Sequence, residues 1–167
     1  MVSIRNARVD DLLGMQHCNQ QCLPEHYKIN YFSYILLCWP SLSYVAEDDT
    51  GKIIGYILVK YEDEIGKEDE KRGHVVSLAV SRSFRRLGIA KKLIYLSCRA
   101  LVDNYSANQL SLQVRISNSN AINLYLERMD FKKAKVLSAY YVDGEDAFLL
   151  VKDLTNLQQL KLLNKSS

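Results

Sequence analysis

A short polar turn near the middle of the chain carries the residues best suited to chemistry. Residues 85–90 read Arg-Arg-Leu-Gly-Ile-Ala and follow the apolar run 76–80. This places a turn between a strand and a long helix, where unpaired N–H groups and the helix dipole attract anions. Gly88 lets the backbone approach a ligand closely, and Arg85 and Arg86 add positive charge. The turn predicts a phosphate or pyrophosphate site.

The turn differs from the two familiar phosphate-binding loops. It has too few glycines for a Walker A motif or for the dinucleotide-binding Gly-x-Gly-x-x-Gly pattern. The alternative interpretation is an ordinary helix start with two surface arginines.

Apolar periodicity and turn residues predict the elements around this turn, which read as one mixed α/β domain of the α+β kind. The expected strands are 2–8, 43–47, 52–60, 75–80, 110–114, 131–137 and 147–151. The expected helices are 86–105, 118–129, the aromatic segment 27–39, and a first helix with Asp10 as its N-cap. We expect the domain to span residues 1–154, with residues 155–167 as a short helix or a frayed tail.

Composition restricts the class of protein. The 167 residues are 48% hydrophobic and 25% charged, which is typical of a globular domain, and the net charge of +3 is too small to predict nucleic-acid binding. The cysteines form no Cys-x-x-Cys pair, and Cys18 and Cys22 have no second ligand pair, so we expect reduced thiols and no metal site. Charges at Arg5 and Arg8 argue against a signal peptide, and the apolar stretch 31–46 is too short to span a bilayer. The expected location is the cytoplasm, with the nucleus as a second location.

Two motifs together resemble the GCN5-related N-acetyltransferase (GNAT) superfamily. The Arg-x-x-Gly-x-Ala turn after an apolar strand is similar to its acetyl-CoA motif. Asn118-x-x-Ala121-x-x-Leu124-Tyr125 resembles its later helix motif, and Phe131 follows. Asp130 departs from the pattern, since many members have glycine before that phenylalanine.

Further segments resemble one group of that superfamily, the catalytic subunits of the NatA protein N-terminal acetyltransferases. These segments are 5–8, 23–27, 42–48, 73–80, 114–118 and 140–147, and the resemblance covers about residues 1–154. It implies a central mixed, mostly antiparallel sheet, splayed at the cofactor site and flanked by helices. It also implies direct acetyl transfer from acetyl-CoA to protein N-termini exposed after Met removal (Ser, Ala, Thr, Gly), with acidic N-termini preferred by the lone chain.

The resemblance carries site residues onto this sequence. The implied cofactor-binding residues are Leu78, Ala79, Val80, Arg85, Arg86, Leu87, Gly88, Ile89, Ala90, Asn118 and Tyr125. The implied catalytic residues are Glu25, His74, Arg115 and Tyr141, and the implied substrate-binding residues are Leu23, Pro24, Tyr27 and Tyr140. A backbone N–H near Leu78 would stabilise the oxyanion, and Tyr125 would protonate the leaving thiolate.

Several of these roles have alternatives. Glu25 is the base, the residue that orients the peptide amine, or a surface glutamate just past a helix end. His74 is either a proton relay or a hydrogen-bonded strand-end histidine. Arg115 is either a substrate contact or an ion-paired residue. Adjacent strand residues face opposite ways, so Tyr141 is preferred over Tyr140 as the one facing the peptide. The same alternation places His74, Val76 and Leu78 on one face.

The resemblance also implies partners. These are nascent-chain N-termini, a large helical-repeat auxiliary subunit wrapped around the first two helices, and the ribosome through that subunit. No direct nucleic-acid or membrane partner is expected. The alternatives are a lysine or other amine acetyltransferase of the same fold and, more remotely, a non-catalytic acyl-CoA-binding module.

Overall fold

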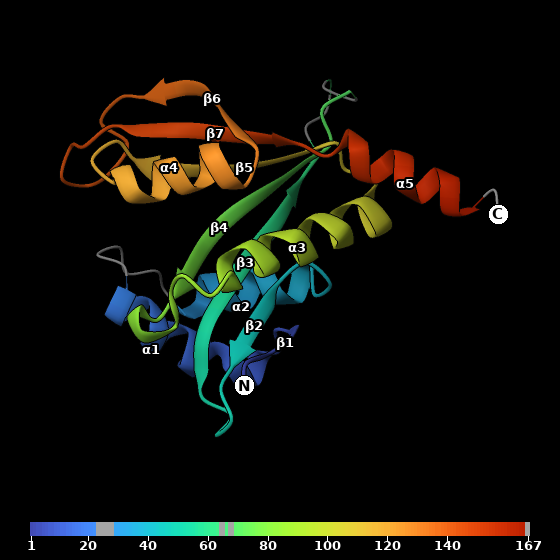
Figure 1. The fold of residues 1–167 in the computed structure, drawn as a ribbon. Helices are drawn as coiled ribbons and strands as arrows, with labels where there is room; N and C mark the ends of the chain where they lie inside the picture. The colour runs from blue at the N-terminus through green and yellow to red at the C-terminus, as the bar shows by residue number, and fades with distance from the viewer. Residues whose placement is uncertain (23–28, 64–65, 67–68, 166–167) are drawn as a thin grey trace.

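The computed structural model describes residues 1–22, 29–63, 66 and 69–165 (Figure 1). Within them the strands β1 to β7 form one mixed sheet in the order β1-β2-β3-β4-β5-β7-β6. β4 and β5 run parallel, and the other neighbouring strands run antiparallel. The strands are Ser3–Asn6, Tyr44–Glu47, Ile53–Glu62, Arg72–Val80, Gln109–Arg115, Phe131–Leu137 and Ala147–Asp153. The expected fold class is confirmed.

Helices cover both faces of the sheet, so the protein has two apolar cores. α1 (Leu12–Cys22) and α2 (Ile29–Cys38) pack on one face, with fully buried Met15 and Ile35. α3 (Ile89–Tyr105) and α4 (Ser119–Arg128) pack on the other, with the buried residues Leu93, Leu101 and Ile122. The tail forms α5 (Thr155–Lys165), which packs beside α3.

The sheet opens between β4 and β5. Their parallel register runs only from Arg72 opposite Gln109 to His74 opposite Ser111, and beyond this point the two strands diverge (Figure 1). At the paired end Gly73 faces α3, where an added Cβ would collide with the Leu101 side chain. Close packing of α3 therefore holds the apex of the gap.

β4 contains a bulge just beyond the apex of the gap. Leu58 of β3 pairs with Ser77, whereas the next residue, Val59, pairs with Val75. Val76 is the extra residue of β4. A bulge of this kind bends its strand and redirects its side chains, and such bulges are frequent beside active sites.

The bulge corrects one prediction about β4. Val75 and Leu78 pack into the core under α3, while Val76 and Ala79 pack into the core under α1 and α2. Regular alternation predicts that His74, Val76 and Leu78 share a face, and this is wrong for Leu78. The extra residue shifts the side-chain alternation of β4 by one position.

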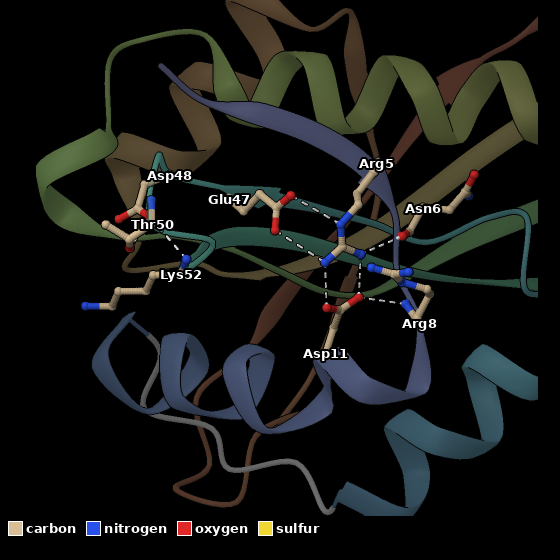
Figure 2. Close-up of polar contacts among 8 residues, drawn as sticks. All are labelled: Arg5, Asn6, Arg8, Asp11, Glu47, Asp48, Thr50 and Lys52. Carbon is tan, nitrogen blue, oxygen red and sulfur yellow. Dashed lines mark hydrogen bonds and ion pairs between the residues drawn. The ribbon is translucent and has the colours of Figure 1, made fainter.

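An ion pair fixes the start of α1 against the edge of the sheet (Figure 2). The Arg5 guanidinium donates to both carboxylate oxygens of Asp11 at 2.8 Å, and Glu47 lies at 3.4 Å. Asp11 also accepts from the Arg8 backbone N–H at 2.8 Å. The expected N-cap Asp10 instead lies inside a short 3₁₀ helix, Val9–Asp11, that precedes α1. That prediction is wrong because Asp11, through its long-range partner Arg5, organises this helix start.

Candidate active site

The turn between β4 and α3 has the backbone expected of an anion site. After the 3₁₀ segment Arg82–Phe84, Arg86 and Gly88 both adopt left-handed conformations, with φ of 65° and 78°. A Cβ built on Gly88 meets nothing within 4 Å, so the space before the α3 N-terminus is open. A positive φ at a non-glycine residue such as Arg86 is uncommon. The first N–H groups of α3 have no partner within the helix and point toward this space.

The residues next to Gly88 have different side-chain environments. Leu87 is 65% exposed, whereas Ile89 is buried in the core under α3, and Ala90 packs against the same core. Ile89 and Ala90 therefore offer a ligand their backbone N–H groups, because their side chains point into the protein. Arg85 and Arg86 are exposed beside the turn.

β4 turns one backbone edge toward the gap. The Ser81 N–H donates to the Ile54 carbonyl of β3 at 2.7 Å, so backbone groups of Ser81 face β3. Backbone direction alternates along a strand, and the Val80 carbonyl accordingly accepts from Arg85 Nε at 3.0 Å on the other side. Leu78 lies two residues before Val80, so its N–H points to the same side as the Val80 carbonyl, away from β3. The Leu78 N–H is therefore directed into the gap between β4 and β5.

α4 brings two predicted cofactor residues to the same side of the sheet as α3. Asn118 is the N-cap of α4, and its side-chain oxygen accepts from the Ala121 N–H at 3.3 Å. The Tyr125 ring packs edge-on against Phe131, with centroids 5.5 Å apart. Burial raises the pKa of Tyr125 to about 12. Its hydroxyl is therefore protonated at neutral pH and able to act as a donor.

His74 lies on the opposite face, at the apex of the gap. Its side chain is buried, and its Nδ1 lies 2.7 Å from Ser111 Oγ on β5. Burial is the largest influence on His74 and lowers its pKa, Lys60 and Arg72 lower it further, and Glu62 and Gln113 oppose the shift. The imidazole is therefore neutral at pH 7 and can accept a proton.

Charged side chains lie near His74 on this face, and phenolic side chains lie near Lys60. Lys60, directly opposite His74 on β3, forms an ion pair with Glu62 at 3.2 Å. The Lys60 pKa is raised, because the contacts with Glu62 and Tyr31 outweigh the opposing effect of burial. Burial raises the pKa of Tyr140, and Lys60 and Tyr31 also act on it. These interactions bring α2, β3, β4 and the loop between β6 and β7 to one polar site.

Arg115 anchors the loop between β6 and β7. Its Nη1 donates to Asp143 Oδ2 at 2.9 Å and to Glu145 Oε1 at 2.8 Å, and its guanidinium lies 4.0 Å from the Tyr141 ring centroid. Tyr140 packs edge-on against Tyr141, with centroids 5.0 Å apart. Both interpretations of Arg115, as a substrate contact and as an ion-paired residue, involve this loop. The contacts that Arg115 makes with the loop hold Tyr140 and Tyr141 beside the gap.

Four predicted residues, Leu23, Pro24, Glu25 and Tyr27, lie outside the described residues. The other predicted site residues divide between the two faces of the gap. The turn, Asn118 and Tyr125 lie on the side of α3 and α4. His74 and Arg115 lie on the side of α1 and α2, and the Leu78 N–H lies between the two groups.

The donor set fits the phosphates of acetyl-CoA. Open space at Gly88, unpaired N–H groups at the start of α3 and two adjacent arginines suit a pyrophosphate. The edge of β4 that borders the gap suits the amide groups of a pantetheine arm. In the described part of the chain, no group of three or more His, Cys, Asp or Glu residues is placed to hold a metal ion. Likewise, none of the described helices is both long and apolar enough to cross a bilayer.

The sequence motifs missed two contributors to this site. Lys60 and Glu62 fall where a strand was expected to give way to a charged loop, and β3 in fact continues to Glu62. Their alternate positions on the extended strand put both on the His74 face. The sequence signal for these two residues was the two-residue alternation of side chains, which continues along the strand as far as residue 62.

Known proteins share this arrangement of elements. Residues 12–131 match the acetyltransferase (GNAT) family. The chain belongs to the GNAT family. The N-terminal acetyltransferase A complex catalytic subunit NAA10 of Arabidopsis thaliana is 49% identical over 158 residues, which cover 95% of this chain and 81% of the relative. N-alpha-acetyltransferase daf-31 of Caenorhabditis elegans is 48% identical, covering 92% of this chain and 83% of the relative. The resemblance to GNAT proteins and to NatA catalytic subunits is confirmed.

Solved GNAT structures superimpose on the chain. A chain of the NatC complex bound to Gag peptide and CoA has a TM-score of 0.82 at 28% identity, covering 91% of this chain and 98% of that one. Chaetomium thermophilum Naa20 in complex with a bisubstrate analogue also has a TM-score of 0.82, at 29% identity, covering 95% of this chain and 89% of that one. The GNAT fold therefore extends beyond the matched segment 12–131.

Proposed function

We propose that the chain transfers the acetyl group of acetyl-CoA to the α-amino group of protein N-termini. The observation that carries this proposal is the gap between β4 and β5, which connects two different faces. An anion-binding turn lies on one face and a buried neutral histidine with charged neighbours lies on the other. Relatives named as N-terminal acetyltransferase subunits support the same activity.

The proposed chemistry is a direct transfer with both substrates bound. An α-amino group has a pKa near 8, so a useful fraction is neutral at cellular pH and a modest base suffices. The amine nitrogen attacks the thioester carbon, the new C–N bond forms and the C–S bond breaks. The Leu78 N–H stabilises the oxyanion, and the protonated Tyr125 hydroxyl supplies a proton to the thiolate. His74 or Glu25 accepts the proton that the amine loses.

We further propose that the acceptors are N-termini with small first residues, Ser, Ala, Thr or Gly, exposed after Met removal. The lone chain would prefer acidic first residues. Leu23, Pro24 and Tyr27 would line the first-residue pocket, and Tyr140 and Tyr141 would hold the peptide backbone. The position of Tyr140 near Lys60 and Tyr31 supports an acceptor path on this face.

A partner subunit is also part of the proposal. The exposed side of α2 presents Tyr34 and Leu37, which are 56% and 69% exposed. An auxiliary subunit built of helical repeats would cover this side, adjust the loop that contains Glu25, and dock the pair on cytoplasmic ribosomes. The names of relatives as complex subunits support such a partner.

The test is CoA release from acetyl-CoA with four peptides. Three have free N-termini and begin with Ser, Glu and Met-Leu, and the fourth is N-terminally blocked with an internal lysine. Turnover on the Ser or Glu peptide and none on the blocked peptide is the expected result. Turnover confined to the blocked peptide would instead identify a lysine acetyltransferase. Absence of turnover on all four, with and without the auxiliary subunit, would identify a non-catalytic acyl-CoA-binding module.

A further inference from the structure

Three buried polar side chains connect α1 to the strands beside the gap. Asn19 Nδ2 donates to Tyr56 Oη at 2.8 Å and lies 3.4 Å from Ser77 Oγ, and Tyr56 Oη lies 2.7 Å from Ser77 Oγ. Asn19 is 2% exposed, Tyr56 is fully buried and Ser77 is 5% exposed. We call these residues the Asn19–Tyr56–Ser77 cluster.

The cluster includes Tyr56, which belongs to the apolar core under α1 and α2. Its surroundings on this face include Met15, Val45, Leu58 and Ala79. Burying polar groups costs free energy unless each is hydrogen-bonded, and apolar side chains of similar size would fill the same space without that requirement. Hydrogen bonds differ from apolar contacts in fixing direction and distance. The cluster thus has a geometry that packing alone would not impose.

One end of the cluster adjoins the proposed reaction site, and the other lies in α1. Asn19 lies in the second half of α1, the helix that leads into residues 23–28, which include Glu25. Ser77 lies in β4 beside the bulge and directly precedes Leu78, whose N-H points into the gap. Tyr56, in the central strand β3, contacts both. The three hydrogen bonds therefore link α1 to β4, the strand that carries the Leu78 amide.

Further contacts hold α1 against the same strands. A Cβ on Gly14 would lie 2.8 Å from Ile53 Cγ1, so α1 approaches β3 closely there. Cys18 Sγ lies 3.7 Å from Ser81 Oγ at the end of β4. These contacts keep α1 on the sheet, but apolar and sulfur contacts are weakly directional. The cluster supplies the directional restraint.

We propose that the Asn19–Tyr56–Ser77 cluster is a positioning device for acetyl transfer, which holds β4 beside its bulge and so fixes the position of the Leu78 amide in the gap. This inference rests on the proposed function. None of the three side chains needs to touch the substrates. Loss of the restraint displaces the Leu78 amide relative to the thioester oxygen, and displacements near 1 Å can lower rates by about a hundredfold.

The experiment compares Tyr56→Phe and Ser77→Ala in the full chain. Each variant removes one hydroxyl without changing the apolar shape. We expect kcat for a Ser- or Glu-starting peptide to fall by about tenfold or more, while the Kd of acetyl-CoA changes by less than about twofold. The double variant should lose no more than the worse single variant, because the hydroxyls act as a unit. Ser77→Thr, which keeps the hydroxyl, should recover most of the activity.

Ser97→Ala is the matched control for loss of a buried hydroxyl. Ser97 is fully buried in α3 and donates to the Leu42 carbonyl at 2.8 Å, on the other face of the sheet. We expect it to lower Tm as much as Ser77→Ala does and to leave kcat unchanged. Equal losses of kcat in both variants would show that the cluster only stabilises the fold.

The remaining outcomes separate the two proposals. Wild-type turnover together with a fully active Tyr56→Phe variant would overturn the positioning role alone. Ser77→Ala decides the question by the same criterion if Tyr56→Phe does not fold. Absence of wild-type turnover on every free N-terminus, with the auxiliary subunit present, would overturn the proposed function and the positioning role with it.

Discussion

Gly88 combines a left-handed backbone with open space at the place where a phosphate is expected. Its φ of 78° is strained for any side chain, and a glutamate would add a negative charge to the anion site. Such a carboxylate would compete with the phosphates for the α3 N–H groups.

We expect Gly88→Glu to weaken acetyl-CoA binding by at least about a hundredfold, because it removes the close approach of the backbone and adds charge repulsion. Titration calorimetry with acetyl-CoA measures the effect. Gly51→Glu is the matched control, since Gly51 has a φ of 84° and equally open space, but lies in the turn between β2 and β3. Unchanged affinity in Gly88→Glu would contradict the phosphate assignment.

His74 links the site to the pH dependence of stability. Burial lowers its folded-state pKa below the unfolded value of 6.5. Above that value His74 is neutral in both the folded and the unfolded state, so it adds no pH dependence to the free energy of unfolding. As the pH falls below it, the unfolded state takes up a proton more readily than the folded state, so the free energy of unfolding declines.

We therefore expect wild-type stability to fall between pH 7.5 and pH 5.5, and His74→Gln to fall less steeply. Urea denaturation at several pH values measures both slopes. A His74→Gln slope equal to the wild-type slope would show that the folded state protonates His74 as readily as the unfolded chain does.

At the scale of elements, the Arg5–Asp11 pair ties β1 to the start of α1. Asp11 is buried, which opposes its ionisation, but hydrogen bonds from Arg5 and from the Arg8 backbone lower its pKa below 3.8. The resulting stabilisation is present above pH 3.8 and is lost as the pH falls through the folded-state value. Asp11→Asn should lower the free energy of unfolding by about 1–3 kcal/mol at pH 7.

Chemical denaturation measures this loss. Asp49→Asn is its control, because Asp49 pairs with the exposed N-terminus, and the change should stay within about 0.5 kcal/mol. Equal effects of both substitutions would show that the buried pair is energetically no better than a surface one.

Local sequence patterns predicted the helices and strands. The bulge in β4 and the pairing of Arg115 depend on contacts between residues that are far apart in the sequence. The hairpin at Asp48–Gly51 and the helices after Gly88 and Asn118 follow from nearby residues, and they are confirmed. The bulge at Val76 depends on the register with β3, which no local pattern specifies. The pairing of Arg115 with Asp143 and Glu145 spans about thirty residues and likewise could not be read from spacing. The proposed roles of Leu23, Pro24, Glu25 and Tyr27 stay predictions.

At the scale of the whole molecule, the exposed side of α2 is available to a partner. Leu37→Asp should abolish a complex with the auxiliary subunit from the same organism. It should change the stability of the lone chain by less than about 0.5 kcal/mol, because the side chain is 69% exposed. Size-exclusion chromatography of the mixed subunits measures the complex.

Leu162→Asp on α5 is the control for a new charge on an exposed leucine, since Leu162 is 67% exposed. It should leave the complex intact. Loss of the complex in both variants, or in neither, would contradict an interface centred on α2.

The interruption of the sheet between β4 and β5 also bears on how this architecture tolerates mutation. The edge of β4 that borders the gap offers main-chain groups, which every amino acid except proline supplies in the same way. Sequence drift along β4 can reshape the walls of the gap without removing its hydrogen-bonding edge. A recognition surface made of backbone is therefore inherited with the fold itself, while the side chains on the opposite face are free to diverge toward new acceptors.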